Sequence, residues 1–151
     1  MDWLIFNTES CRGFKTELLI TETVTRQKWG FPTRSRSAPI EQIKYFVGHL
    51  CLIGYTVGDV RVDEDGSLAR STEFMKTCID ELKLVVQTTG GYNSENNGMV
   101  ESPIKPIKRC IRVFLIGATM PDIIWCYAFC WAIYVMNHRY NRSIDNIPIV
   151  K

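Results

Sequence analysis

Two short stretches decide the fold of this chain: VRVDEDG at residues 60–66 and TTGGYNSENNGMVE at residues 88–101. In the first stretch, a β-branched segment that predicts a strand ends at Asp63, and Gly66 follows. In the second, a loop rich in Gly, Asn, Thr and Ser leads to Glu101, where a helical pattern begins. An α/β fold can bring a carboxylate at a strand end close to a carboxylate at a helix start. Carboxylates held in this way bind divalent metal ions, and two-metal sites cleave or join phosphodiester bonds.

Strand and helix signals alternate on both sides of these stretches. β-branched or alternating segments predict strands at residues 3–6, 14–25, 27–33, 57–62 and 84–86. Apolar residues at helical spacing predict helices at residues 39–53, 72–82, 99–116 and 121–139. This order predicts an α/β sandwich with a mixed sheet that opens as an antiparallel meander. Residues 2–6 and 57–62 are expected to be neighbouring strands, and 151 residues leave room for one domain.

The spacing of apolar residues also predicts which faces of the first two helices are buried. For residues 39–53 this face comprises Ile43, Phe46, Val47, Leu50 and Cys51. For residues 72–82 it comprises Phe74, Cys78, Ile79 and Leu82.

Composition and charge fit an ordinary soluble globular protein. Apolar residues make up 46% of the chain and charged residues 23%. A formal net charge of +2 does not by itself indicate a nucleic-acid-binding protein. The basic residues are nevertheless clustered, in one group at Arg26, Lys28, Arg34 and Arg36 and in another at Lys105, Lys108, Arg109 and Arg112. No acidic residue lies between Glu101 and Asp122.

The six cysteines do not predict a structural zinc site. They include no Cys-x-x-Cys pair, and the chain has only two histidines, so clustered zinc ligands are not expected. Cys110, Cys126 and Cys130 lie among apolar residues and are expected to be small buried side chains. The first residues lack the basic flank of a signal peptide. A nuclear or cytoplasmic location with reduced thiols is therefore expected, and secretion is not.

Residues 123–136 carry no charge, but they are too short to cross a membrane. Fourteen helical residues extend about 21 Å, whereas the hydrocarbon core of a bilayer is roughly 30 Å thick. We expect a buried or interface helix with Trp125, Phe129, Ala132 and Ile133 toward the core, and no membrane partner.

The segment from Asp63 to Asn137 resembles the integrase catalytic domain of copia-type retrotransposons, which has a ribonuclease-H-like fold. Residues 61–68, RVDEDGSL, match the family's motif around its second acid, and residues 88–101 resemble its Thr…Tyr…Asn-Gly-x-x-Glu block. The second match is the more specific. Residues 19–26, LITETVTR, resemble the block that follows the family's first acid, which corresponds to Asp2. The resemblance implies an α/β fold with a ribonuclease-H-like, mixed five-stranded sheet flanked by helices.

The resemblance also implies a catalytic centre. Asp2, Asp63 and Glu101 would be the catalytic acids and the ligands of Mg²⁺ or Mn²⁺. Asp65 is an alternative second acid, because the 35 residues between it and Glu101 match the family's common spacing, whereas Asp63 leaves 37. We favour Asp63, since a strand end fixes the carboxylate while loops tolerate insertions.

DNA is the partner that this resemblance implies. Lys105, Lys108 and Arg112 recur along one helix face and would contact the DNA backbone, and Asn97 lies in the loop before Glu101. The chain departs from the family at Ser102 and at the Lys105-Pro106 pair. It also contains only one module of the polyprotein. Residues 1–151 are thus expected to be a single, N-terminally truncated, integrase-core-like domain, as in a fragmentary element copy.

Three functions remain open from the sequence. The first is a polynucleotidyl transferase or endonuclease that carries out DNA strand transfer. The second is a non-catalytic remnant that binds nucleic acid or protein because its acids no longer assemble. The third is an interaction domain that uses residues 123–136 as the face of a homodimer.

Overall fold

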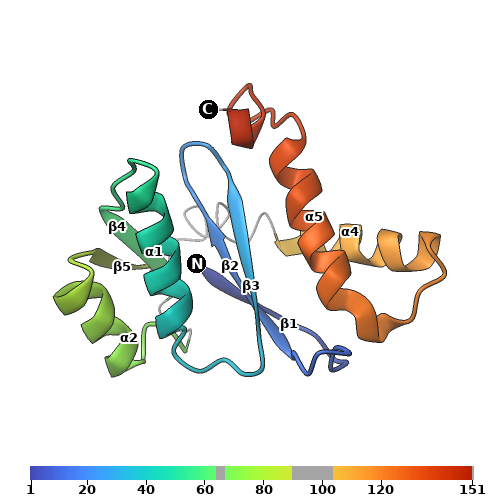
Figure 1. Cartoon of the computed structure of the whole chain (residues 1–151), viewed down its shortest axis with the longest axis horizontal. Coiled ribbons are helices and arrows are strands. Elements are labelled where there is room, and N and C mark those ends of the chain that lie inside the picture. Colours follow the sequence, from blue (N-terminus) through green and yellow to red (C-terminus); the bar gives the residue numbers. More distant parts are fainter. Residues whose placement is uncertain (64–66, 90–103, 151) are drawn as a thin grey trace. The chain divides into compact units, whose positions relative to one another are not determined.

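The computed structural model describes residues 1–63, 67–89 and 104–150 (Figure 1). The chain divides into two compact units. The first comprises Met1–Asp2 and Arg36–Gly98, and the second comprises Trp3–Ser35 and Met99–Lys151.

The second unit contains a three-stranded sheet in the order β1-β2-β3. Its strands are β1 (Asp2–Ile5), β2 (Thr16–Thr21) and β3 (Lys28–Thr33), and Asp2 itself is assigned to the first unit. β2 and β3 pair antiparallel, from Thr16 opposite Thr33 to Thr21 opposite Lys28. The expected opening meander is therefore confirmed for β2 and β3, and β1 lies beside β2 as expected.

Two helices, α4 (Ile104–Gly117) and α5 (Trp125–His138), form the core of this unit with the sheet. Between them, η2 (Asp122–Ile124) is a short 3-10 helix, and η3 (Pro148–Val150) is another near the end of the chain. Buried side chains from both helices meet Leu4 of β1 and Leu19 of β2. The predicted core face of residues 121–139 is confirmed, since Trp125, Phe129, Ala132 and Ile133 are all buried.

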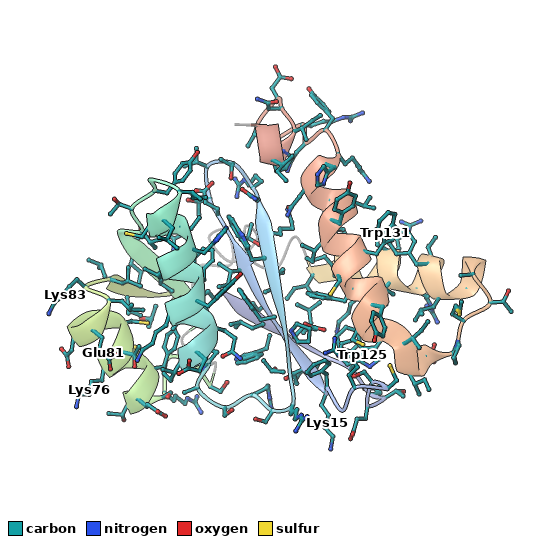
Figure 2. All side chains as sticks on the ribbon, in the orientation of Figure 1. Lys15, Lys76, Glu81, Lys83, Trp125 and Trp131 are labelled. Carbon is teal, nitrogen blue, oxygen red and sulfur yellow. The ribbon has the colours of Figure 1, made fainter. Side chains whose placement is uncertain are left out.

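Not every cysteine of this region is buried as expected. Cys126 is buried, Cys110 is half-buried and Cys130 is exposed, and all six cysteines are free thiols. The prediction was wrong for Cys130 because an apolar sequence context does not specify which side of the helix faces solvent. α5 also carries both Trp125, which is 2% exposed, and Trp131, which is 53% exposed (Figure 2).

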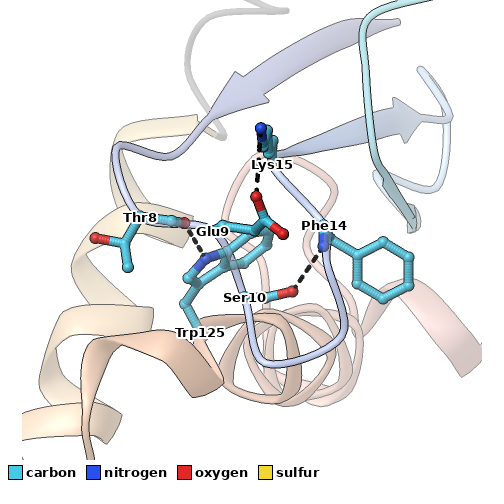
Figure 3. A network of polar contacts seen from close by, with 6 residues as sticks. All are labelled: Thr8, Glu9, Ser10, Phe14, Lys15 and Trp125. Carbon is cyan, nitrogen blue, oxygen red and sulfur yellow. Dashed lines mark hydrogen bonds and ion pairs between the residues drawn. The ribbon is translucent and has the colours of Figure 1, made fainter.

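The loop between β1 and β2 is attached to the start of α5 (Figure 3). The Trp125 indole stacks on Phe6, with ring centroids 3.8 Å apart, and its Nε1 donates to the Thr8 carbonyl at 2.7 Å. Within the loop, the Ser10 hydroxyl accepts the Phe14 N–H at 2.9 Å. Gly13 provides the positive φ of 77° that the turn requires. The Trp125 side chain thus packs in the core and also fixes the loop between β1 and β2.

The side chain of Asn137 joins α5 to β3. Its Nδ2 donates to the Lys28 carbonyl at 2.8 Å, and its Oδ1 accepts the Lys28 N–H at 2.9 Å. Both residues are buried, so the amide satisfies two backbone groups that water does not reach.

Close packing of Phe129 on β3 leads to a stability prediction for Gly30. A Cβ at residue 30 would lie 2.1 Å from the Phe129 ring, which is 1% exposed and cannot move into solvent. We expect Gly30→Ala to lower the free energy of unfolding by about 2 kcal/mol, the usual cost of overpacking a core. Urea unfolding followed by tryptophan fluorescence measures it.

Gly48 provides the matched control, because it lies within a helix and a Cβ there would meet nothing within 4 Å. Gly48→Ala is expected to raise the free energy of unfolding by up to about 1 kcal/mol through helix propensity. Equal stability of the two variants would contradict the close approach of Phe129 to β3.

The first unit is built around a β-α-β arrangement. The strands β4 (Asp59–Asp63) and β5 (Val85–Thr89) pair in parallel, and between them lie α2 (Thr72–Lys76) and the π-helical turn η1 (Thr77–Glu81). The Ser71 hydroxyl caps α2 by accepting the Phe74 N–H at 3.2 Å. This unit also contains the helix α1 (Ile40–Leu52).

The buried faces of these helices differ in part from the expected ones. Ile43 and Phe46 of α1 are buried as expected, but Cys51 is exposed in the last turn. Phe74 and Cys78 are buried as expected, whereas Ile79 is 47% exposed and Thr77 is buried instead. The π turn adds a residue to the helical turn, so the spacing of an α-helix no longer holds beyond Lys76.

The five expected strands and four expected helices of the α/β fold are therefore present, although the strands hydrogen-bond as sheets of three and two. Across the described residues, no helix is long and apolar enough to span a membrane.

Candidate functional site

Asp63 is the last residue of β4, as the sequence predicted. It pairs with Thr89, the last residue of β5, in the parallel register of these strands. Parallel strands present their carboxyl ends at one edge, and ligand sites of α/β proteins form at such edges. Asp63 and Thr89 therefore lie at the same edge of this two-stranded sheet. The side chain of Asp63 lies outside the described part of the structure.

Asp2 is the first residue of β1 and is half-buried. The α-ammonium of its neighbour Met1 donates to the carbonyl of Arg61 at 2.6 Å, across 60 residues of sequence. Arg61 lies two residues before Asp63, so this bond brings the segment that contains Asp2 to the strand that ends in Asp63. Burial lowers the pKa of the Met1 α-ammonium to about 6, an effect that Asp2 opposes and Arg61 adds to.

Residues 2–6 and 57–62 were expected to be neighbouring strands, but β1 and β4 belong to different hydrogen-bonded sheets. The Met1–Arg61 hydrogen bond joins only the residue before β1 to β4, inside the first unit. The guanidinium of Arg61 donates to Gln87 Oε1 of β5 at 3.1 Å, which ties the same position to the next strand.

Asp65, Asn97 and Glu101 lie outside the described residues, so the structure tests neither the alternative second acid nor the third acid. Among the side chains that it does describe, no three His, Cys, Asp or Glu are grouped closely enough to hold a metal ion. Of the three predicted acids, that search includes only the side chain of Asp2. As a donor set, three carboxylates fit Mg²⁺ or Mn²⁺, which prefer hard oxygen ligands.

The predicted nucleic-acid contacts on α4 are exposed. Ile107, Ile111 and Leu115 form its buried face, and Lys105, Lys108 and Arg112 lie on its solvent side with Arg109. As described, α4 begins at Ile104, so Pro106 falls in its first turn. A proline there removes no helical hydrogen bond, because the first N–H groups of a helix have no partner within it.

The sequence analysis did not single out an exposed aromatic face on α5. It placed only Trp125, Phe129, Ala132 and Ile133 toward the core, and Tyr127, Trp131 and Tyr134 are each more than half exposed. Their separations of four and three residues were the signal, since such residues share one face of a helix.

The sequence matches no protein-family description and no curated protein sequence. Its structure, however, is similar to chains from retroviral integrases. In the intasome of simian T-cell lymphotropic virus with the PP2A regulatory subunit B56 gamma, the match has a TM-score of 0.71 and 16% identity, and covers 97% of this chain. This chain spans only 52% of the length of that one.

Two isolated catalytic cores match over most of both chains. The HTLV-2 integrase catalytic core domain, in complex with magnesium and in a trimeric form, gives a TM-score of 0.66 at 16% identity, with 98% of this chain and 88% of that chain covered. The catalytic core domain of BIV integrase gives 0.63 at 17% identity, with 97% and 90% covered. This chain therefore has the α/β fold of the retroviral integrase catalytic cores.

Proposed function

We propose that this chain is the catalytic domain of a copia-type retrotransposon integrase, which cleaves and joins DNA strands with a divalent metal ion. The observation that carries the proposal is the pairing of Asp63 with Thr89 at the ends of two parallel strands. The sequence that continues from Thr89 contains the block that ends in Glu101. The likeness of the fold to integrase cores supports the same assignment.

Asp2, Asp63 and Glu101 would hold the metal ions, as oxygen ligands from β1, from β4 and from the segment before α4. Bound Mg²⁺ or Mn²⁺ would supply an activated water or DNA 3′-hydroxyl and would stabilise the leaving oxygen. The three carboxylates would remain ionised as ligands. The strand end of β4 orients Asp63, and the Met1–Arg61 hydrogen bond orients the segment of Asp2.

The partner that we propose is DNA, contacted by α4 and by Asn97 of the preceding segment. Lys105, Lys108 and Arg112 are exposed along one side of α4, where long cationic side chains can reach phosphates. A nuclear or cytoplasmic location would give access to DNA and would keep the free cysteines reduced.

Replacing Lys105 and Lys108 together with glutamine is expected to weaken duplex DNA binding and to reduce its salt dependence. Each lost phosphate contact should lower the slope of log affinity against log salt by about 0.9. Fluorescence anisotropy between about 50 and 200 mM salt measures both quantities.

The control is the double replacement of Lys76 and Lys83, two exposed lysines of the first unit (Figure 2). It removes the same charge from another surface. An equal change of slope in both double variants would show that net charge, and not α4, sets the affinity.

A second candidate function is a non-catalytic nucleic-acid-binding module. The exposed basic side of α4 favours it, because phosphate contacts there need no assembled carboxylates. The test is a nicking and strand-transfer assay on plasmid DNA with Mg²⁺ or Mn²⁺. Products that need the metal support the integrase proposal, whereas DNA binding without any product supports the binding module.

A further inference from the structure

The loop between β1 and β2 brings Cys11 to the start of α5, although Cys11 and Cys126 are 115 positions apart in sequence. The backbone N–H of Cys11 donates to the carbonyl of Ile123 at 2.7 Å, three residues before Cys126. A second bond, from Trp125 Nε1 to the Thr8 carbonyl at 2.7 Å, holds the same loop (Figure 3). Both cysteines belong to the second unit, so their positions are fixed within one compact body.

The side chains of the two cysteines are in contact. Cys11 and Ser10 both hydrogen-bond to the Cys126 thiol through their side chains. The Ser10 oxygen already accepts the Phe14 N–H at 2.9 Å, so its hydroxyl hydrogen is available for the Cys126 sulfur. A disulfide requires its two cysteines to be close and well oriented. Thiols that touch while their backbone is held meet this requirement with little movement of the chain.

The two thiols differ in how an oxidant can reach them. Cys11 is exposed, whereas Cys126 is 2% exposed. Burial raises the pKa of the Cys126 thiol more than its hydrogen bond with Ser10 lowers it. Because the thiolate is the form that reacts, an oxidant in solution attacks Cys11 first. Cys126 is then the thiol in place to react with the oxidised Cys11.

Cys130 is the other cysteine of α5, and its geometry makes it a poor partner for Cys126. Residues four apart on a helix have Cβ atoms about 5–6 Å apart. A disulfide spans only roughly 3.5–4.5 Å between Cβ atoms. Pairing within the helix would therefore distort α5, whereas pairing with Cys11 joins two segments that already touch.

We propose that Cys11 and Cys126 form a reversible disulfide, which fastens the loop between β1 and β2 to α5 under oxidising conditions. Hydrogen peroxide converts the Cys11 thiol to a sulfenic acid, and one water leaves. The Cys126 thiol then attacks the Cys11 sulfur, the S–S bond forms, and a second water leaves. In total, each thiol loses one hydrogen and the peroxide is reduced to two waters.

This pair is a redox-sensitive switch and not a permanent cross-link. In the nuclear or cytoplasmic location proposed above, cellular thiols keep cysteines reduced, and disulfides there are usually transient and redox-sensing. Thiol–disulfide exchange with a reduced dithiol returns both cysteines to the free state. The pair includes none of the three predicted acids, so it is independent of the proposed cleavage activity.

The test is oxidation of the full chain with hydrogen peroxide, alkylation of the remaining thiols with N-ethylmaleimide, and chymotrypsin digestion without reductant. Chymotrypsin cleaves after Tyr127 and so separates Cys126 from Cys130. Mass spectrometry should find the peptide of Cys11 linked to that of Cys126, and dithiothreitol should release it. The Tm of the oxidised protein should rise by roughly 5 to 15 °C, because a cross-link that closes so long a loop restricts the unfolded chain.

Cys11→Ser is the decisive variant, because the Cys11 side chain is exposed and its replacement leaves the core unchanged. This variant should show neither the linked peptide nor the dithiothreitol-reversible rise in Tm. Cys130→Ser is the matched control on the next turn of α5, and it should retain both.

Three results would overturn the proposal. One is the absence of a peptide that links Cys11 to Cys126 after oxidation. Another is a link from Cys126 to Cys130, or between two copies of the chain, in its place. The third is a reversible rise in Tm of equal size in Cys11→Ser, which would assign the stabilisation to a different pair of thiols.

Discussion

An Asp63→Asn variant is expected to lose metal-dependent nicking of plasmid DNA by at least about 100-fold, because an amide cannot replace a charged metal ligand. Asp65→Asn is expected to retain most of the activity. The difference follows from the strand end: β4 fixes the backbone of Asp63 beside Thr89, and Asp65 lies two residues beyond that strand. Glu101→Gln should abolish nicking like Asp63→Asn. Initial rates in Mg²⁺ and in Mn²⁺ measure all three effects.

Duplex DNA binding in EDTA is the control for these variants, and each should keep its Kd to within about twofold, since phosphate contacts supply the metal-free affinity. If Asp65→Asn were inactive and Asp63→Asn active, the second acid would be Asp65. Activity that survives Glu101→Gln would mean that these carboxylates are not the metal site.

The second large effect concerns Glu17, which is expected to make the protein less stable as the pH rises. Glu17 is on β2, fully buried, and neither carboxyl oxygen has a hydrogen-bond partner among the described residues. Burial raises its pKa from 4.5 to about 9. The folded protein therefore keeps a proton that the unfolded chain releases above about pH 4.5.

The stabilisation from this proton is fully present below the unfolded pKa and is lost as the pH rises toward about 9. At pH 7 the loss amounts to about 3 kcal/mol, from 1.36 kcal/mol for each pH unit above 4.5. Glu17→Gln, which cannot titrate, should be more stable than the unchanged protein at pH 7 and similar to it near pH 4.5. Urea unfolding between pH 4.5 and 8 measures the difference.

Glu22, which directly follows β2, is a control for which the dependence of stability on pH has the opposite sign. Burial raises its pKa, but hydrogen bonds from Thr25, Val24 and Thr23 lower it more, and the net pKa is below 4.5. Glu22 therefore stabilises the fold above its unfolded pKa and loses this effect as the pH falls. Glu22→Gln should be the less stable variant at pH 7. A flat pH profile for the unchanged protein would contradict the burial of Glu17.

Element types could be predicted because local patterns match local structure in this chain. The alternation in residues 57–62 predicted β4, and the capping serine at residue 71 marks the start of α2. The faces of helices were less predictable where geometry departs from the α-helix. Ile79 fits an apolar α-helical pattern, but the π turn directs it outward. No local pattern indicates that Glu17 is buried, since burial of a polar side chain in a strand depends on what packs on the sheet.

For the candidate site, the sequence predicted the part that a strand determines. Asp63 lies at the end of β4 because the β-branched residues before it favour a strand and the acids and glycine after it do not. The sequence could not show that Thr89 would be its partner, because pairing register depends on how β4 and β5 pack. It also did not single out the exposed aromatic face of α5, since the exposed side of an uncharged helix is not marked by charged residues.

The Asn137 side chain has a consequence for how the protein avoids aggregation. β3 is one of the two edge strands of the order β1-β2-β3, and an open edge is a template for adding strands from other molecules. Lys28, Gly30 and Pro32 direct their backbone groups to that edge, as alternate residues of one strand. The Asn137 amide occupies both groups of Lys28, and Pro32 has no N–H to offer. An incoming strand therefore finds no continuous hydrogen-bonding ladder along β3, and this edge of the sheet is protected against pairing with another molecule.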